Sequence, residues 1–108
     1  MRKGKKKEGR AANYLKEKGY KIIGRNVIKR INQHKKAEYD IIAKRGNYKY
    51  AVEVKSGRQV LTTSDIIKLH KKANNIKAKP LLITGSKVKL TEKAKKELKR
   101  RKIRWEII

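Results

Sequence analysis

The chain has 108 residues, enough for one hydrophobic core, so we expect a single domain over residues 1–108. Hydrophobic residues make up 37% of it, which excludes a disordered polyelectrolyte, and the lack of cysteine excludes disulfides and thiolate metal sites. No apolar run reaches transmembrane length, and no signal-peptide core follows the basic start. We therefore expect a cytoplasmic protein that does not enter a membrane.

The charge is strongly one-sided. Thirty-four lysines and arginines against nine acidic residues give a formal net charge of +25. Such self-repulsion costs stability unless a polyanion relieves it, and nucleic acid releases its condensed counterions on each phosphate contact. A merely solvated lysine surface is one alternative, and an anionic membrane surface is another, disfavoured because no predicted helix opposes a broad apolar face to a basic one. We expect a nucleoid-associated, DNA-binding protein.

The chain begins with a short basic arm, residues 1–10, which leads into a short helix over residues 11–19. Gly19 ends this helix as its C′ residue. Glu8 lies three residues before Ala11 and seven before Leu15, so helical spacing places it on the same stripe as the apolar contacts.

Aliphatic and β-branched runs then predict three strands, over residues 20–28, 38–44 and 47–55. Gly24 marks a bulge or bend in the first of them. The polar segment 29–37 is predicted to be a mobile basic loop. Arg45, Gly46 and Asn47 form a hairpin turn between the second and third strands.

The second half of the chain alternates helices and strands. After a loop, Ser64 is the expected N-cap of an amphipathic helix, and Thr91 caps the last helix. The expected elements are a helix over 65–77, a strand over 80–84 that is buried on both faces, a helix over 91–102 and a strand over 103–108. The order α-β-β-β-α-β-α-β predicts an α/β fold, a mixed sheet flanked by helices on both faces.

Charged residues interrupt the most apolar strands. Glu53 and Lys55 are two residues apart and therefore project from the same face, while the short turn allows Asp40 to lie beside Glu53 on the neighbouring strand. Two carboxylates and an ammonium in an apolar setting are costly unless something compensates them. A plain salt bridge on an exposed sheet face is the simpler interpretation.

The functional interpretation is a metal site. Two carboxylates suit Mg²⁺ or Mn²⁺, with water and a substrate phosphate completing the shell, and Glu8 is placed to supply a further carboxylate. The metal would polarise a scissile phosphate, and Lys55 would orient or deprotonate the attacking water or stabilise developing charge.

The residues D40-(x12)-E53-V54-K55 match the D…(D/E)-x-K signature of the PD-(D/E)XK nuclease superfamily, although no proline precedes Asp40. Within it the chain most resembles the archaeal Holliday junction resolvases, in K-x-x-x-E-G-R at 4–10, E-Y-D-I-I-A at 38–43, A-V-E-V-K at 51–55 and the closing I-R-W-E-I-I. It also resembles a bacterial family of small uncharacterised endonuclease-like proteins that share the YL-x-x-x-GY…RN…D-x-I…VEVK run.

The resemblance implies a restriction-endonuclease-like fold and a homodimer that nicks two strands symmetrically. It implies that Glu8, Asp40 and Glu53 hold the metal and that Lys55 serves the catalytic water. Arg10 and Arg25 match basic positions that contact DNA. Two departures from the resolvases are that the loop after the first strand has no serine and that the chain has no Phe.

Other basic residues are expected to bind DNA from the arm, the loop after the first strand and the segment after Lys55, namely Lys5, Lys6, Lys7, Lys29, Arg30, Lys35, Lys36 and Arg58. His70 is expected at an interface or core edge rather than on a metal. Trp105 alternates with Ile103 and Ile107, which predicts core packing. The basic helix near the C-terminus is either a DNA contact or a solvated face.

The sequence thus predicts a metal-dependent, structure-selective endonuclease of branched DNA, acting in recombination or repair, with Holliday junctions as the leading substrate. A non-catalytic, architectural DNA-binding protein of the same fold is the first alternative. A related nuclease of flaps, mismatches or single strands is the second, and an RNA-associated basic protein is a more distant one.

Overall fold

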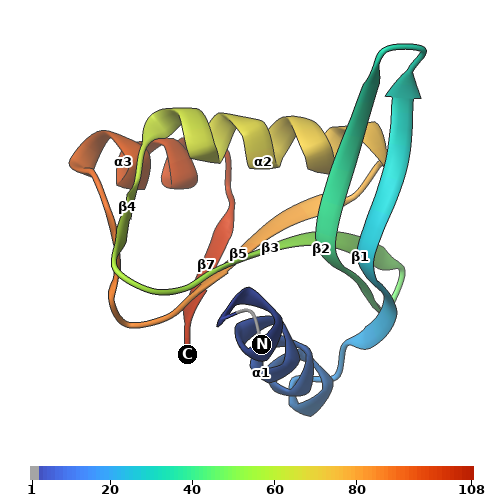
Figure 1. Ribbon diagram of the computed structural model, residues 1–108, viewed down its shortest axis with the longest axis horizontal. Coiled ribbons are helices and arrows are strands. Elements are labelled where there is room, and N and C mark those ends of the chain that lie inside the picture. The colour runs from blue at the N-terminus through green and yellow to red at the C-terminus, as the bar shows by residue number, and fades with distance from the viewer. Residues whose placement is uncertain (1–2) are drawn as a thin grey trace.

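The computed structural model describes the backbone of residues 3–108 and the side chains from Gly9 onward. The elements are α1 (Lys3–Glu17), β1 (Lys21–Asn32), β2 (Lys35–Arg45), β3 (Tyr48–Lys55), β4 (Gln59–Leu61), α2 (Thr63–Asn75), β5 (Lys79–Thr84), β6 (Val88–Leu90), α3 (Glu92–Arg100) and β7 (Arg104–Ile107). One five-stranded sheet has the order β1-β2-β3-β5-β7, and β4 pairs with β6 apart from it. Figure 1 shows α1 on one side of the sheet and α2 and α3 on the other.

The large sheet is mixed. β1, β2 and β3 are antiparallel neighbours, whereas β3, β5 and β7 run parallel. The parallel steps need crossover connections, which α2 supplies between β3 and β5 and α3 between β5 and β7. The interior strand β5 is buried on both faces, as predicted, with Leu81 and Ile83 on the side of α1 and Leu82 on the side of α2 and α3.

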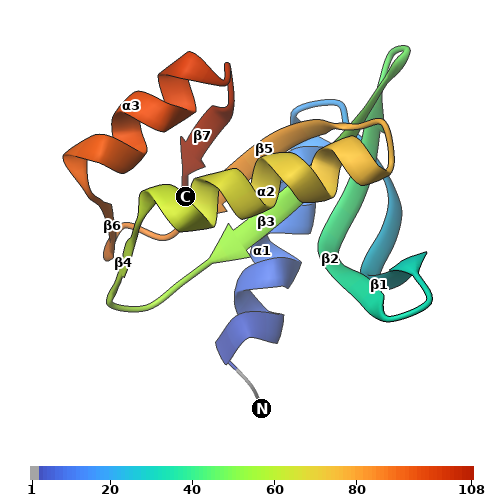
Figure 2. The ribbon, with the colours of Figure 1, turned by 90° about the horizontal axis from the view of Figure 1, so that it is seen from above.

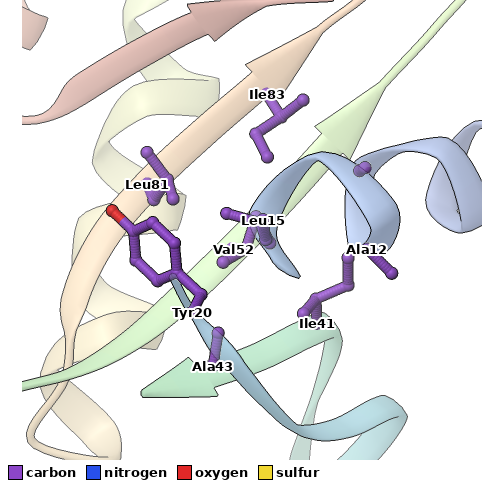
Figure 3. Close-up of a cluster of buried hydrophobic side chains, with 9 residues drawn as sticks. Ala12, Leu15, Tyr20, Ile41, Ala43, Val52, Leu81 and Ile83 are labelled. Carbon is purple, nitrogen blue, oxygen red and sulfur yellow. The ribbon is translucent and has the colours of Figure 1, made fainter. Parts of the chain in front are cut away.

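The core on the α1 side rests on helical spacing. Ala11, Ala12 and Leu15 form the apolar stripe of α1 and pack on Ile41 of β2 and Val52 of β3, as Figure 3 shows for the labelled side chains. Two alanines allow the helix to approach the sheet closely, and Leu15 fills the space between strands. The prediction that this stripe faces the core is confirmed.

On the other side, α2 presents Ile66, Leu69 and Ala73 to the sheet, as its apolar spacing predicts. Leu69 packs with α3 and the small β4–β6 sheet, whereas Ala73 packs against β2. The start of α2 is capped by Thr62 rather than the expected Ser64. The Asp65 carboxylate accepts hydrogen bonds from the Thr62 N–H at 2.8 Å and its hydroxyl at 3.2 Å, a capping box that begins the helix two residues early.

The prediction of a mobile loop over residues 29–37 is wrong. Residues 29–32 continue β1, residues 35–37 begin β2, and the two strands pair from Lys29↔Ala37 to Asn32↔Lys35. The polar composition hid alternation, because Ile31 and Ala37 pack inward while the basic residues between them face solvent. The result is a long basic hairpin, visible at the upper right of Figure 1.

Three other boundaries differ from the sequence prediction. The basic arm is helical from Lys3, because lysine is a good helix former and the arm continues into the buried stripe of α1. The loop after Lys55 contains β4, and the segment after β5 contains β6; both are three-residue strands that pair only with each other, too short to register as a pattern. The last helix, capped by the Thr91 hydroxyl as expected, ends at Arg100.

Two glycines have the roles that the sequence predicted. Gly19 follows α1 with φ +89°, a left-handed conformation that L side chains rarely adopt. Gly24 lies at a register shift in the β1–β2 ladder, and a Cβ there would lie 2.6 Å from Cγ2 of Val27. The hairpin turn at Gly46 also forms as expected. No helix in the described part of the chain combines the length and apolar character needed to cross a membrane.

Because Leu15 is fully buried between α1 and the sheet, we expect Leu15→Ala to lower the free energy of unfolding by about 2–5 kcal/mol in urea denaturation. The matched control is Ile107→Ala on the edge strand β7, where the side chain is 58% exposed and the change should stay within about 0.5 kcal/mol. Equal effects of the two substitutions would contradict the assigned core.

Candidate active site

The alternation of side chains along β2 shifts by one residue at Asp40. Tyr39 packs against α2 and Ile41 packs against α1, although residues two apart on a regular strand share a face. Across the ladder, the pairs Arg25↔Ile41 and Val27↔Tyr39 flank Asn26, which has φ +52°. Asparagine tolerates this left-handed conformation better than most residues. The irregularity lets the hairpin leave the plane of the sheet just at Asp40.

Asp40 also closes the ladder between β2 and β3. The last paired residues are Ile41 and Val52, so beyond this point β3 has lost β2 as a backbone partner. The Asp40 carboxylate takes over, because Oδ2 accepts a hydrogen bond of 2.9 Å from the Val54 N–H. This bond holds the half-buried carboxylate beside the strand that carries Glu53 and Lys55, as the sequence predicted.

Glu53 lies between two ammonium groups. Its Oε2 is 3.6 Å from Nζ of Lys55 on the same strand, and its Oε1 is 3.0 Å from Nζ of Lys72 on α2. The side chains are 18% exposed for Glu53, 32% for Lys55 and 24% for Lys72. The cluster is therefore partly covered by α2, and it is not the exposed salt bridge on an open sheet face that was the simpler interpretation.

Lys72 is the site residue that the sequence interpretation missed. Its backbone carbonyl accepts a 2.7 Å hydrogen bond from the Tyr39 hydroxyl, and its ammonium lies 5.2 Å from the centroid of the Tyr39 ring. Burial raises the pKa of Tyr39 above its ordinary value, so this hydroxyl remains a donor to higher pH than an exposed tyrosine would. The sequence predicts that α2 is amphipathic, but it does not show which of its lysines reaches Glu53. The one available signal is that Lys68 and Lys72 lie one helical turn apart and therefore share a side of the helix.

A small hollow of about 120 Å³ opens beside this cluster. It is lined by Glu53, Lys55, Asp65, Lys68, Leu69 and Lys72. One of its two carboxylates, Asp65, is engaged in capping α2. Three ammonium groups around the hollow, those of Lys55, Lys68 and Lys72, suit an anion such as a phosphate.

The donor set fits a magnesium-type ion. Asp40 and Glu53 offer carboxylate oxygens from adjacent strands, and Mg²⁺ binds through one or two carboxylates with water and substrate phosphate. Among the residues whose side chains the structure describes, no group of three or more His, Cys, Asp or Glu comes together. The third expected ligand, Glu8, lies on α1 by its backbone, but its side chain is outside the described residues, as are those of Lys5, Lys6 and Lys7.

The two arginines expected near the scissile phosphate lie in different places. Arg25 pairs with Ile41, next to Asp40, and its Nη2 would lie 3.9 Å from a Cβ on Gly9 of α1. Arg10 is exposed and lines a separate hollow of about 230 Å³ that includes the C-terminal Ile108. Arg25 therefore lies on the α1 side of the sheet, opposite the strand neighbour of Asp40, whereas the Glu53 carboxylate is bound by Lys72 on the α2 side.

The remaining predicted DNA-binding residues fall on two surfaces. Four lie on the exposed hairpin of β1 and β2, namely Lys29, Arg30, Lys35 and Lys36. Arg58 lines the outer side of the β4–β6 sheet, in a hollow of about 510 Å³ with Lys87 and Lys89. Neither surface includes a side chain bonded to Glu53.

The C-terminal elements are largely structural. Glu97 is bound by Arg100 at 3.0 Å and Arg101 at 2.7 Å, and these hydrogen bonds lower its pKa. The core-edge position expected for His70 agrees with its half-buried ring, whose Nδ1 lies 2.6 Å from Nη1 of Arg101. Trp105 packs on the core of α2 and α3 as predicted, whereas its alternating neighbour Ile107 is exposed because β7 is an edge strand.

Solved structures with the same arrangement define the fold. A protein of unknown function, AF1548, superposes with a TM-score of 0.76 at 22% identity, covering 93% of this chain and 55% of its own. EndoMS in complex with double-stranded DNA superposes with a TM-score of 0.66 at 16% identity, covering 100% of this chain and 46% of the EndoMS chain. SfsA of Pyrococcus furiosus with Ca²⁺ superposes with a TM-score of 0.59 at 19% identity, covering 93% of this chain and 55% of the SfsA chain. The α/β mixed sheet with its three helices is the restriction-endonuclease-like fold that nucleases share.

The family follows from sequence. The model described as "Uncharacterised protein family UPF0102" matches residues 7–100, so the chain belongs to that family. The UPF0102 protein of Kosmotoga olearia is 44% identical over 57 residues, covering 53% of this chain and 45% of the relative. That of Thermotoga neapolitana is 40% identical over 74 residues, covering 68% and 64%. The alignments thus span about half to two thirds of these relatives, and the finer likeness to archaeal junction resolvases stays a prediction.

The Asp40–Val54 hydrogen bond gives a stability prediction. Asp40→Ala removes the acceptor from a partly buried N–H at the end of the ladder and should cost about 1–3 kcal/mol of unfolding free energy. Asp40→Asn keeps a side-chain oxygen there and should cost much less. Urea denaturation of both variants checks this, and equal destabilisation would show that the acceptor does not matter.

Proposed function

We propose that the protein is a metal-dependent, structure-selective DNA endonuclease, with four-way (Holliday) junctions as its leading substrate and paired nicks as its outcome. The observation that carries the proposal is the hydrogen bond from the Val54 N–H to the Asp40 carboxylate, which holds Asp40 at the strand segment where Glu53 and Lys55 form an ion pair. A metal-dependent hydrolase of phosphodiesters needs oxygen ligands for its cation and gains from a nearby ammonium, and these residue types lie on adjacent strands in a fold that nucleases share.

In this proposal Asp40 and Glu53 hold Mg²⁺ or Mn²⁺, and Glu8 supplies a further carboxylate from α1. The bound ion would polarise the scissile phosphate and lower the pKa of a bound water. Lys55, held 3.6 Å from Glu53, orients that water or stabilises the charge that develops on the phosphate. Divalent ions suit this fold, since SfsA has been solved with Ca²⁺.

The DNA would be held through its phosphates. The net charge of +25 and the exposed basic hairpin favour contact with the backbone, and EndoMS is a fold neighbour solved with double-stranded DNA. Phosphate contacts carry no sequence information, so selectivity would come from branch geometry. A homodimer with two such sites would cut two strands symmetrically, which matches the two-fold symmetry of a four-way junction.

A second function is favoured by one observation. Both carboxylates have structural partners, because Asp40 accepts the Val54 N–H and Glu53 is paired with Lys55 and Lys72. A non-catalytic DNA-binding protein of the same fold would need no more than this. The two candidates differ in whether the carboxylates are required for cleavage or only for stability.

Cleavage of a synthetic four-way junction separates them. With Mg²⁺ or Mn²⁺, wild-type protein should cut, while Asp40→Asn, Glu53→Gln and Lys55→Gln should each reduce the rate by about 10²-fold or more and retain junction binding. Matched controls are the exposed Glu92→Gln on α3 and Lys49→Gln on β3, which should cut at the wild-type rate.

Wild-type binding without cleavage in either metal would establish the non-catalytic function. Full activity of Asp40→Asn or Glu53→Gln would show that the assigned site is wrong. Comparison of junction, flap, mismatch, duplex and single-stranded substrates at one salt concentration identifies the preferred structure, because affinity depends steeply on salt.

Lys72 gives an independent check on the metal ligands. Its ammonium lies 3.0 Å from Glu53 Oε1 and competes electrostatically with any cation bound there. We expect Lys72→Met to bind Mn²⁺ several-fold more tightly in calorimetric titration, whereas Lys71→Met, an exposed neighbour on α2, should bind as wild type does. Unchanged affinity in Lys72→Met would argue against Glu53 as a ligand.

A further inference from the structure

A basic groove runs between the β1–β2 hairpin and α2, outside the cluster of Asp40, Glu53 and Lys55. Its volume is about 330 Å³, and Figures 1 and 2 show the hairpin beside the C-terminal end of α2. The groove is lined by Ile31, Lys35, Lys36, Ala37, Glu38, Lys68, Lys71, Lys72 and Asn75. From the sequence we expected Lys35 and Lys36 to bind DNA, and we assigned no function to the α2 lysines.

Small residues bring the two walls together. Ala37 of β2 and Ala73 of α2 are buried in one cluster, which also includes Tyr39, Ile42, Ala51 and Ala78. The Tyr39 hydroxyl then ties β2 to α2 through the Lys72 carbonyl at 2.7 Å. The walls are thus fixed by packing and a hydrogen bond, so the groove exists before any ligand binds.

The positive charge of the groove favours binding of an anion. Five lysines line it against one carboxylate, that of Glu38. In the described part of the chain, Lys72 is the one groove lysine with an ion pair, and its partner Glu53 lies in the neighbouring hollow. Ammonium groups held this close repel one another, and a phosphate chain relieves that cost through several contacts at once.

The groove is continuous with the candidate active site. Lys68 and Lys72, one helical turn apart on α2, line both the groove and the hollow that contains Glu53 and Lys55. A phosphate chain in the groove would therefore reach the carboxylate cluster along this pair of lysines.

We propose that this groove holds one DNA strand where it separates from its partner at a branch, and that Lys68 and Lys72 lead that strand to Glu53. The inference rests on the proposed function and adds the path of the substrate. A hollow of this volume accepts a nucleotide-sized part of one strand and not the full width of a double helix. Ile31 and Ala37 give the groove an apolar floor for an unpaired base, and the lysines hold the phosphates.

Fluorescence anisotropy with full-length protein tests this without cleavage, in EDTA, using a labelled short thymidine strand and a duplex of equal length. The groove variant is Lys35→Gln, Lys36→Gln and Lys71→Gln combined, exposed residues that have no contact with Glu53. The matched control removes the same charge from α3 by Lys93→Gln, Lys96→Gln and Lys99→Gln, all exposed.

Wild type should prefer the single strand, and the groove variant should lose about tenfold or more in affinity for it. The slope of log affinity against log salt should fall by about 2, since each phosphate contact contributes about 0.7 for single strands. The control variant should keep both the preference and the slope. Equal losses of affinity in the two variants would contradict the proposal that the groove binds a single strand. Equal binding of duplex and single strand by the wild type would contradict it as well.

Cleavage assays keep the two proposals separable. If wild type prefers the single strand and only the groove variant loses it, but no metal supports cutting, the groove stands and the nuclease function fails. If wild type cuts a junction through Asp40 and Glu53 while the groove variant binds and cuts normally, the nuclease function stands and the groove fails.

Discussion

The geometry of the site depends on one hydrogen bond, from the Val54 N–H to the Asp40 carboxylate. It lies where β2 ceases to pair with β3 and turns with β1 into the basic hairpin. An unpaired backbone N–H at this point would cost free energy, so a side-chain acceptor is required to end the ladder. The same carboxylate that ends the ladder is thereby fixed beside Glu53, and the same turn brings the hairpin against α2.

Glu53 shows how a very basic protein surrounds a partly buried carboxylate with compensating charge. Lys55 approaches it from the same strand and Lys72 from α2, so its charge is compensated on two sides. Tyr39 holds the backbone of α2 at that position. The site and the basic groove therefore share a wall, since Lys68 and Lys72 belong to both.

The sequence interpretation was most successful where periodicity is strong. The apolar stripes of α1 and α2, the buried strand β5 and the turn at Gly46 all follow from short-range pattern and turn chemistry. It failed over residues 29–37, because a hairpin that alternates lysines with single apolar residues looks like a polar loop. It also missed β4 and β6. These short strands are defined only by pairing with each other, and α2 and β5 separate them in the sequence.

What the sequence determined by itself was the residue types of the candidate site and their local order. Glu53 and Lys55 share a face because residues two apart on a regular strand do, and a short turn returns the chain toward Asp40. Only the tertiary structure decided that Asp40 ends a ladder, that Lys72 pairs with Glu53 and that the hairpin forms a groove with α2. Asp40 and Val54 are 14 positions apart and Glu53 and Lys72 are 19 apart, and such pairs depend on which helix face packs on which strand, which no local pattern encodes.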